Sequence, residues 1–164
     1  MDDGREESTN TVRFLKTNSG KKGQGMPVVR NPQFYFREGL CWSDINTTFL
    51  KCRKKQSSIN DVKSMSLFGM TDLVPEDYII ALINSTLFSY YVDTFVNNTQ
   101  TFQINDARQL PIVIPTSTLV DIAHRIVNQA IGIKKDCACE KETRLSSLQY
   151  MLDSWVMEIY NLQS

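Results

Sequence analysis

The amino-acid sequence predicts an α+β fold: a small, curved, mostly antiparallel sheet with one buried helix, closed by a C-terminal helical hairpin. Three observations lead to this prediction. Between residues 34 and 69, short apolar and aromatic runs alternate with turn residues, which is typical of short strands. Residues 75–93 are apolar on most sides, as in a core helix. Residues 117–164 hold two stripes of apolar residues at helical spacing.

The first part of the chain divides into an arm and a strand region. Residues 1–30 are polar and rich in Asn, Thr, Lys and Gly, so we expect a flexible arm or a long loop there. The α+β part is expected at residues 31–116, where Gly39 and Gly69 punctuate four runs of strand-forming residues. These runs are residues 34–36, 40–42, 47–50 and 64–68.

The core helix is expected to start at a proline. Pro75 suits the first helical position, because its missing N–H has no partner there, and the two acidic residues that follow suit the positive end of the helix dipole. Apolar residues then recur at helical spacing to about Asp93. Beyond the helix, residues 101–104 alternate like a strand, and the prolines in residues 110–115 favour an edge or extended segment.

Two helices are predicted for residues 117–164, packed as a hairpin on the α+β part. Ser117 can cap the first helix, whose apolar residues form one stripe. The second helix runs from about Glu140 and also has an apolar side. We expect this hairpin to close the domain or to meet a partner.

Length and composition fit a single globular domain. A chain of 164 residues with 41% apolar and 22% charged residues has an ordinary globular composition and can bury about 70% of its unfolded surface. No apolar run reaches the roughly 18 residues needed to span a bilayer, and the acidic start of the chain does not resemble a secretory signal. We therefore expect a cytoplasmic protein, without a membrane partner, whose four cysteines are reduced.

The formal net charge of zero hides a separation of charge along the chain. Residues 8–63 hold eleven basic and three acidic residues, whereas residues 64–164 hold six basic and eleven acidic residues. Such asymmetry indicates that one part faces a polyanion. A solvated surface without a partner is an equally good explanation of the composition alone.

Catalytic and metal sites are not indicated. The sequence Asn31-Pro32-Gln33-Phe34 superficially resembles the Asn/Asp-Pro-Pro-aromatic loop of amino-methyltransferases, but it lacks the second proline, and no glycine-rich cofactor loop follows a strand. Cys137 and Cys139, expected in the turn between the last two helices, and the single His124 are too few for a zinc site. We expect no catalytic residue and no metal, and we interpret His124 as a surface or hydrogen-bonded helix residue.

Four sequence blocks, in order, are similar to one known kind of domain. The blocks are Asn31-Pro32-Gln33-Phe34-Tyr35-Phe36-Arg37-Glu38-Gly39-Leu40-Cys41-Trp42-Ser43-Asp44-Ile45, residues 61–69, the helical residues 78–87 with Asn84-Ser85, and residues 101–112, which begin Thr101-Phe102-Gln103-Ile104. Together they resemble the C-terminal target-recognition domain of TaqI-like, type IIG and BREX-type adenine-N6 DNA methyltransferases. The closing Glu158-Ile159-Tyr160-Asn161-Leu162 is also similar to the family's last helix. The chain departs from the family at Leu40 and Cys41, where Ile and Thr are usual, and in lacking the catalytic domain.

The resemblance implies sequence-specific recognition of double-stranded DNA for a restriction-modification or phage-exclusion methyltransferase. It implies a part that is non-catalytic by itself and holds no cofactor. S-adenosylmethionine would belong to a methyltransferase catalytic domain, in cis or in trans. The alternative is a protein-interaction module that docks on a methyltransferase, or associates with itself, through its C-terminal helices.

Candidate DNA-binding residues follow from the basic segment together with the resemblance. They are Arg37, Lys51, Arg53, Lys54, Lys55, Gln56, Lys21 and Lys22, with Arg30 as a further nearby cation. The lysines after residue 50 are expected to contact phosphates, whereas the two arginines in or before the basic stretch are expected to contact bases or phosphates.

The remaining polar and aromatic residues divide between the loop and the core. Gln56, Ser57, Ser58 and Asn60 have polar side chains that can read base edges, but an exposed hairpin loop explains them as well. Trp42, Phe36 and Phe102 are interpreted as packing residues. Asn84 and Ser85 are expected to tie loops to the core helix by hydrogen bonds.

Overall fold

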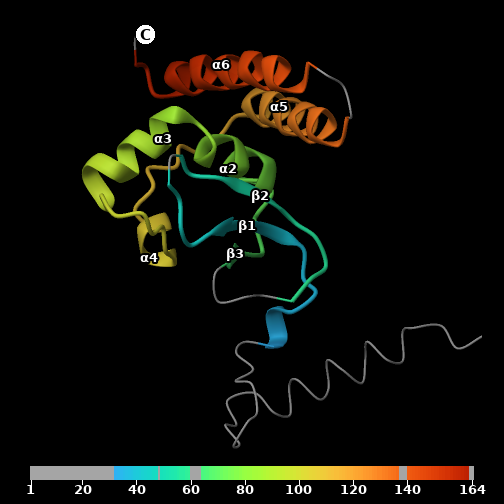
Figure 1. The fold of residues 1–164 in the computed structure, drawn as a ribbon, viewed down its shortest axis with the longest axis vertical. Helices are drawn as coiled ribbons and strands as arrows, with labels where there is room; N and C mark the ends of the chain where they lie inside the picture. Colours follow the sequence, from blue (N-terminus) through green and yellow to red (C-terminus); the bar gives the residue numbers. More distant parts are fainter. Residues whose placement is uncertain (1–31, 48, 60–63, 137–139, 163–164) are drawn as a thin grey trace, which may run out of the picture.

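A computed structural model describes residues 32–47, 49–59, 64–136 and 140–162. Its elements form an α+β fold, as predicted (Figure 1). The expected arm at residues 1–30 lies outside the described residues. In chain order the elements are η1 (Pro32–Phe34), β1 (Gly39–Ser43), β2 (Cys52–Lys55), β3 (Ser64–Leu67), α2 (Glu76–Ile83), α3 (Thr86–Tyr91), the π-helix η2 (Val92–Val96), α4 (Ile104–Ala107), α5 (Ser117–Lys135) and α6 (Lys141–Ile159).

The three described strands form one antiparallel sheet in the order β2-β1-β3. Leu40 of β1 lies between Lys54 of β2 and Leu67 of β3. The central strand begins at Gly39, where an added Cβ would lie 2.3 Å from the carbonyl oxygen of Leu67. Only glycine therefore allows β3 to approach this closely, and Gly39 belongs to the strand rather than to a turn.

The helices lie in layers on one side of this sheet. In Figure 1, α2 and α3 lie next to the strands, and the α5–α6 hairpin covers them from the other side. Each residue of α2 after Glu76 is buried, so α2 is the predicted core helix. The predicted closing hairpin is also confirmed, because α5 packs on α2 and α6 packs on α5 and α3.

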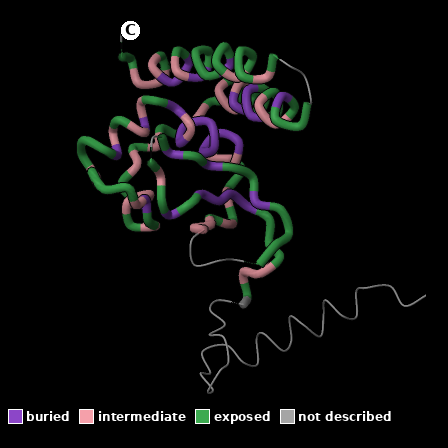
Figure 2. The backbone as a smooth tube through the Cα atoms, viewed as in Figure 1, coloured by how far each residue is buried: buried purple, intermediate pink, exposed green. Residues whose placement is uncertain are grey.

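One apolar core joins the sheet to the hairpin. Figure 2 shows buried backbone along β1, through α2 and on the inner sides of α5 and α6. Trp42 and Phe102 are buried against each other, and the indole N–H of Trp42 donates to the Phe102 carbonyl at 2.8 Å. Their predicted packing role is confirmed. Phe36 differs, because it is 36% exposed and has a φ of 61° in a turn.

The predicted single helix from Pro75 is broken at Asn84 and Ser85. Ser85 caps α3, since its Oγ accepts from the Phe88 N–H at 3.3 Å and donates to the Leu82 carbonyl at 2.7 Å. The Asn84 side-chain amide bonds both backbone groups of Cys52, accepting from its N–H at 3.1 Å and donating to its carbonyl at 2.8 Å. Asn84 therefore ties the strand β2, rather than a loop, to α2, whereas these two bonds of the Ser85 hydroxyl stay within α2 and α3.

Several of the predicted strands are wrong, because residues with a high strand propensity form a strand only where they pair with a neighbouring strand. Residues 47, 49 and 50 of the run 47–50 form no strand, and β2 is instead the basic stretch that follows them. Residues 34–36 form the end of η1 and a turn. Of residues 101–104, only Thr101 forms a bridge, to Ile45, because a capping box at Gln103 starts α4.

Thr116, not Ser117, caps α5, with its hydroxyl accepting from the Leu119 N–H at 3.4 Å. Residues 110–115 are neither strand nor helix, as expected for an extended segment between prolines. Within the described residues, no single helix is long and apolar enough to cross a membrane; α2 and residues 86–96 meet that criterion only as a pair bent by 64°.

Candidate nucleic-acid interface

The basic stretch is itself an edge strand with two different faces. β2 pairs with β1 on one side only, so it forms an edge of the sheet. Because side chains alternate along a strand, Cys52 and Lys54 share the face that packs on α2, whereas Arg53 and Lys55 share the opposite face. We call this opposite side, which lies away from α2, α3, α5 and α6 in Figure 1, the outer face.

Lys54 is partly engaged inside the protein. Its ammonium lies 2.8 Å from Asp77 Oδ1 at the start of α2, and its side chain is 37% exposed. The other oxygen of Asp77 lies 2.6 Å from His124 Nδ1, and His124 Nε2 lies 2.9 Å from the side-chain amide of Asn128. These contacts confirm His124 as a hydrogen-bonded helix residue. The Asp77 carboxylate also balances part of the positive charge of Lys54, which is a predicted phosphate contact.

Lys55, a predicted phosphate contact, is buried and bonded inside the protein. The residue is only 7% exposed. Its ammonium donates to the Ser58 carbonyl at 2.8 Å and to Ser58 Oγ at 2.9 Å, and it lies 5.7 Å from the centre of the Phe68 ring. A buried ammonium needs such acceptors, because losing water without replacing it is costly. Lys55 therefore holds the loop at residues 56–58 instead of reaching a ligand.

Arg37 is exposed and held by two aromatic rings. Its guanidinium carbon lies 5.5 Å from the centre of the Phe34 ring and 5.7 Å from that of Phe68, and the two rings stack at 5.3 Å. Lys55 lies over the same Phe68 ring, so Arg37 belongs to the outer face. Cation–π contacts of this kind orient a planar guanidinium without neutralising its charge.

The loop at residues 56–58 is fixed to the same region. The Phe36 N–H donates to the Ser58 carbonyl at 3.0 Å, and the Ser57 hydroxyl donates to the Phe36 carbonyl at 3.2 Å. Gln56 is exposed within this loop. The loop therefore presents its polar side chains from a fixed position beside Arg37.

The structure thus brings some of the predicted site residues together. Arg37 and the loop at residues 56–58 form what we call the outer-face cluster, Arg53 is exposed on β2, and the exposed Lys51 directly precedes β2. Lys54 is on the other face and Lys55 is buried. The remaining candidates, Lys21, Lys22, Arg30 and Asn60, lie outside the described residues.

Two cations that the sequence analysis did not select lie near β2. Lys134 and Lys135, in the last turn of α5, are exposed and line a groove of about 600 Å³ together with Arg53 and Lys54. They were missed because residues 64–164 are acidic overall. A pair of lysines at a helix C-terminus also suits the helix dipole, so the pattern by itself signals a helix end.

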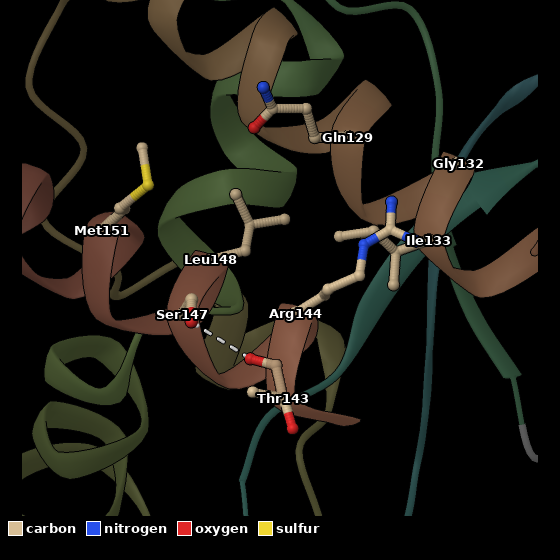
Figure 3. A pocket seen from close by; sticks show the side chains of 8 residues that line it. All are labelled: Gln129, Gly132, Ile133, Thr143, Arg144, Ser147, Leu148 and Met151. Carbon is tan, nitrogen blue, oxygen red and sulfur yellow. Dashed lines mark hydrogen bonds between the residues drawn. The ribbon is translucent and has the colours of Figure 1, made fainter. Parts of the chain in front are cut away.

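A second hollow, of about 500 Å³, lies between α5 and α6 (Figure 3). It is lined by Gln129, Gly132, Ile133, Thr143, Arg144, Ser147, Leu148 and Met151. Arg144 is paired with Asp136 at 2.8 Å, and the Ser147 hydroxyl donates to the Thr143 carbonyl at 3.1 Å. The hollow has no pair of groups suited to acid–base or nucleophilic work, and we assign no chemistry to it.

The two thiols that the structure describes are buried. Cys41 and Cys52 are free and buried, and burial raises the pKa of Cys52 to about 12, so it stays neutral at physiological pH. Cys137 and Cys139 lie outside the described residues. Among the residues that the structure describes, no three potential metal ligands gather.

Neither a scan against models of protein families nor a search of curated proteins found a match to this chain. The resemblance to target-recognition domains stays a prediction from the four sequence blocks, and a functional proposal has to start from the arrangement of the cations.

Proposed function

We propose that this chain binds double-stranded DNA through its outer face and gives an adenine-N6 methyltransferase its sequence specificity. One observation carries the proposal. Arg37 is exposed on the outer face next to a fixed polar loop, and Arg53 is exposed on the edge strand β2. The ordered sequence blocks point to the same function.

The chemistry of this surface suits a duplex. A major groove about 12 Å wide admits a two-stranded β-ribbon, and an arginine there can make paired hydrogen bonds to guanine. Lys51 is placed at the start of the edge strand, where its flexible ammonium can follow a phosphate. The exposed Gln56 can bond to adenine edges.

In this proposal a separate catalytic domain carries out the methylation. The adenine chemistry and S-adenosylmethionine are supplied by a methyltransferase catalytic domain, in cis or in trans, within the cytoplasm of a cell that uses restriction-modification or phage exclusion. The chain alone is expected to transfer no methyl group to DNA. Methylation by the purified chain with S-adenosylmethionine would contradict this division of labour.

Fluorescence anisotropy with a labelled duplex tests DNA binding. Between about 50 and 200 mM salt, four to six phosphate contacts give a slope of log affinity against log salt of roughly −4 to −5. The double variant Arg37→Ala/Arg53→Ala should weaken binding at least tenfold, since each charged hydrogen bond contributes about 1.5–3 kcal/mol. The matched control is Arg108→Ala/Arg125→Ala, which removes two exposed arginines outside the strands, one at the end of α4 and one on α5. Salt-independent binding, or equal losses in both double variants, would refute the proposal.

A protein-interaction module is the second candidate. The observation in its favour is an exposed apolar pair on α6, Tyr150 and Met151, which are 76% and 56% exposed. Replacing both by serine should then abolish assembly with a methyltransferase or with a second copy. If assembly is lost while the Arg37→Ala/Arg53→Ala variant assembles and binds DNA like the wild type, the second candidate is the better one.

A further inference from the structure

The groove between β2, α2, α5 and α6 has an apolar floor. Its volume is about 600 Å³, within the size range of specific binding pockets. Ile80, Ile126, Leu148 and Leu152 form part of the floor and belong to the protein core. Ala130, Ile131 and Leu145 also line the groove but are only partly buried, so apolar surface remains accessible there.

The rim of this groove is positively charged. Arg53 and Lys54 come from β2, and Lys134 and Lys135 come from α5. None of the residues that line the groove is acidic, although the part of the chain after residue 63 is acidic overall. Of the four cations, only Lys54 forms an ion pair within the described residues, with Asp77.

The positions of these cations indicate which kind of ligand the groove can bind. The cations come from two different elements around an apolar floor, so they suit carboxylates spread on both sides of an apolar stripe rather than one anionic headgroup. An amphipathic helix with acidic flanks has that arrangement, and its apolar residues recur at the spacing that fills a groove. We propose that the groove binds an acidic amphipathic helix of a partner protein.

The proposed helix site and the proposed DNA-binding face overlap only at Arg53. The floor of the helix site consists of helix residues, and Lys134 and Lys135 are not part of the outer-face cluster. The test therefore changes the α5 lysines and leaves Arg53 intact, so that failure of one proposal can be told from failure of the other.

A fluorescein-labelled synthetic helix of about 15 residues, with leucines at i, i+3, i+4 and i+7 and glutamates elsewhere, is the probe. We expect the full chain to bind it with an affinity that falls with salt. Lys134→Glu/Lys135→Glu should weaken binding about tenfold, because each change replaces a weak surface attraction to the probe's glutamates by a repulsion. The matched control, Arg108→Glu/Arg125→Glu, should bind the helix like the wild type.

Three comparisons make the test decisive. A probe with lysines in place of all glutamates, and one with serines in place of all leucines, should both bind much more weakly. Ala130→Trp should block the groove without changing its charge, and unchanged thermal melting would show that each variant is folded. Equal binding of the lysine probe, unchanged binding by the α5 double variant, or binding of oleate without the helix would overturn the proposal.

Discussion

Replacing Asn84 by alanine should weaken the attachment of β2 to the core. The Asn84 side chain bonds the N–H and carbonyl of Cys52 at 3.1 and 2.8 Å, and it also donates to the Ile80 carbonyl at 2.8 Å. Cys52 is buried, so Asn84→Ala leaves two backbone groups without partners in a place where water enters poorly. At about 1–2 kcal/mol for each unpaired group, the free energy of unfolding should fall by roughly 2–4 kcal/mol.

Urea denaturation followed by circular dichroism measures that loss, and the exposed Asn98→Ala is the control. For a chain of this size, the loss corresponds to a melting temperature lower by roughly 5–15 °C. Asn84→Asp should cost at least as much as alanine, since a carboxylate oxygen would replace the NH2 group that donates to the carbonyls of Cys52 and Ile80. A loss below about 1 kcal/mol for Asn84→Ala would refute the view that this one amide secures the edge strand.

Three further predictions concern burial and capping. Lys55→Met should release the loop at residues 56–58, seen as faster amide exchange there, but should leave the salt slope of DNA binding unchanged, because this ammonium is bonded internally. Ser85→Ala should lower the free energy of unfolding by about 1 kcal/mol in urea, through loss of the α3 cap. Burial raises the pKa of Cys52 from 9.0 to about 12 in the folded protein. The free energy of unfolding should therefore be constant below pH 9 as far as Cys52 is concerned, and should fall as the pH rises from 9 toward 12, because the unfolded chain loses this proton first. Cys52→Ala should flatten that fall in urea titrations, and a steeper fall would contradict it.

The sequence predicts those parts of the fold in which local pattern and burial agree. β1 and β3 were found because their apolar and aromatic residues mark strands, and α5 because its apolar stripe faces α2. β2 shows the limit of such patterns. Its residues Cys52-Arg53-Lys54-Lys55 are poor in strand formers, and pairing with β1 together with the Asn84 amide makes them a strand. Residues 47–50 have the better strand composition, yet those that are described have no strand partner.

The helix break and the site depend on contacts that no spacing reveals. The apolar period runs on through Asn84 and Ser85, so periodicity alone predicts one helix, although an Asn-Ser pair is also a good capping signal. The burial of Lys55 follows from acceptors on Ser58 and from the ring of Phe68, which is distant in sequence. The accumulation of charge around Lys134 needs β2 and α5 to meet in space.

The division of the basic strand changes how many cations can face DNA. Lys55 is buried and Lys54 is paired, which leaves Arg37, Lys51 and Arg53 as the described candidates that are exposed and without a carboxylate partner among the described residues. At about 0.9 per phosphate, three contacts give a salt slope near −2.7. A slope of −4 to −5 therefore needs contributions from residues such as Lys21 and Lys22.

Lys21 and Lys22 are the candidates for the additional phosphate contacts. Lys21→Ala/Lys22→Ala should reduce the slope by about 1.8, to roughly −2.7, while discrimination between duplex sequences stays the same, because lysines on phosphates attract DNA without reading it. Arg37→Ala/Arg53→Ala should instead reduce discrimination as well as affinity. If removing the two lysines abolished sequence preference and removing the two arginines did not, the bases would be read from the N-terminal segment, and the outer face would serve only to hold the backbone.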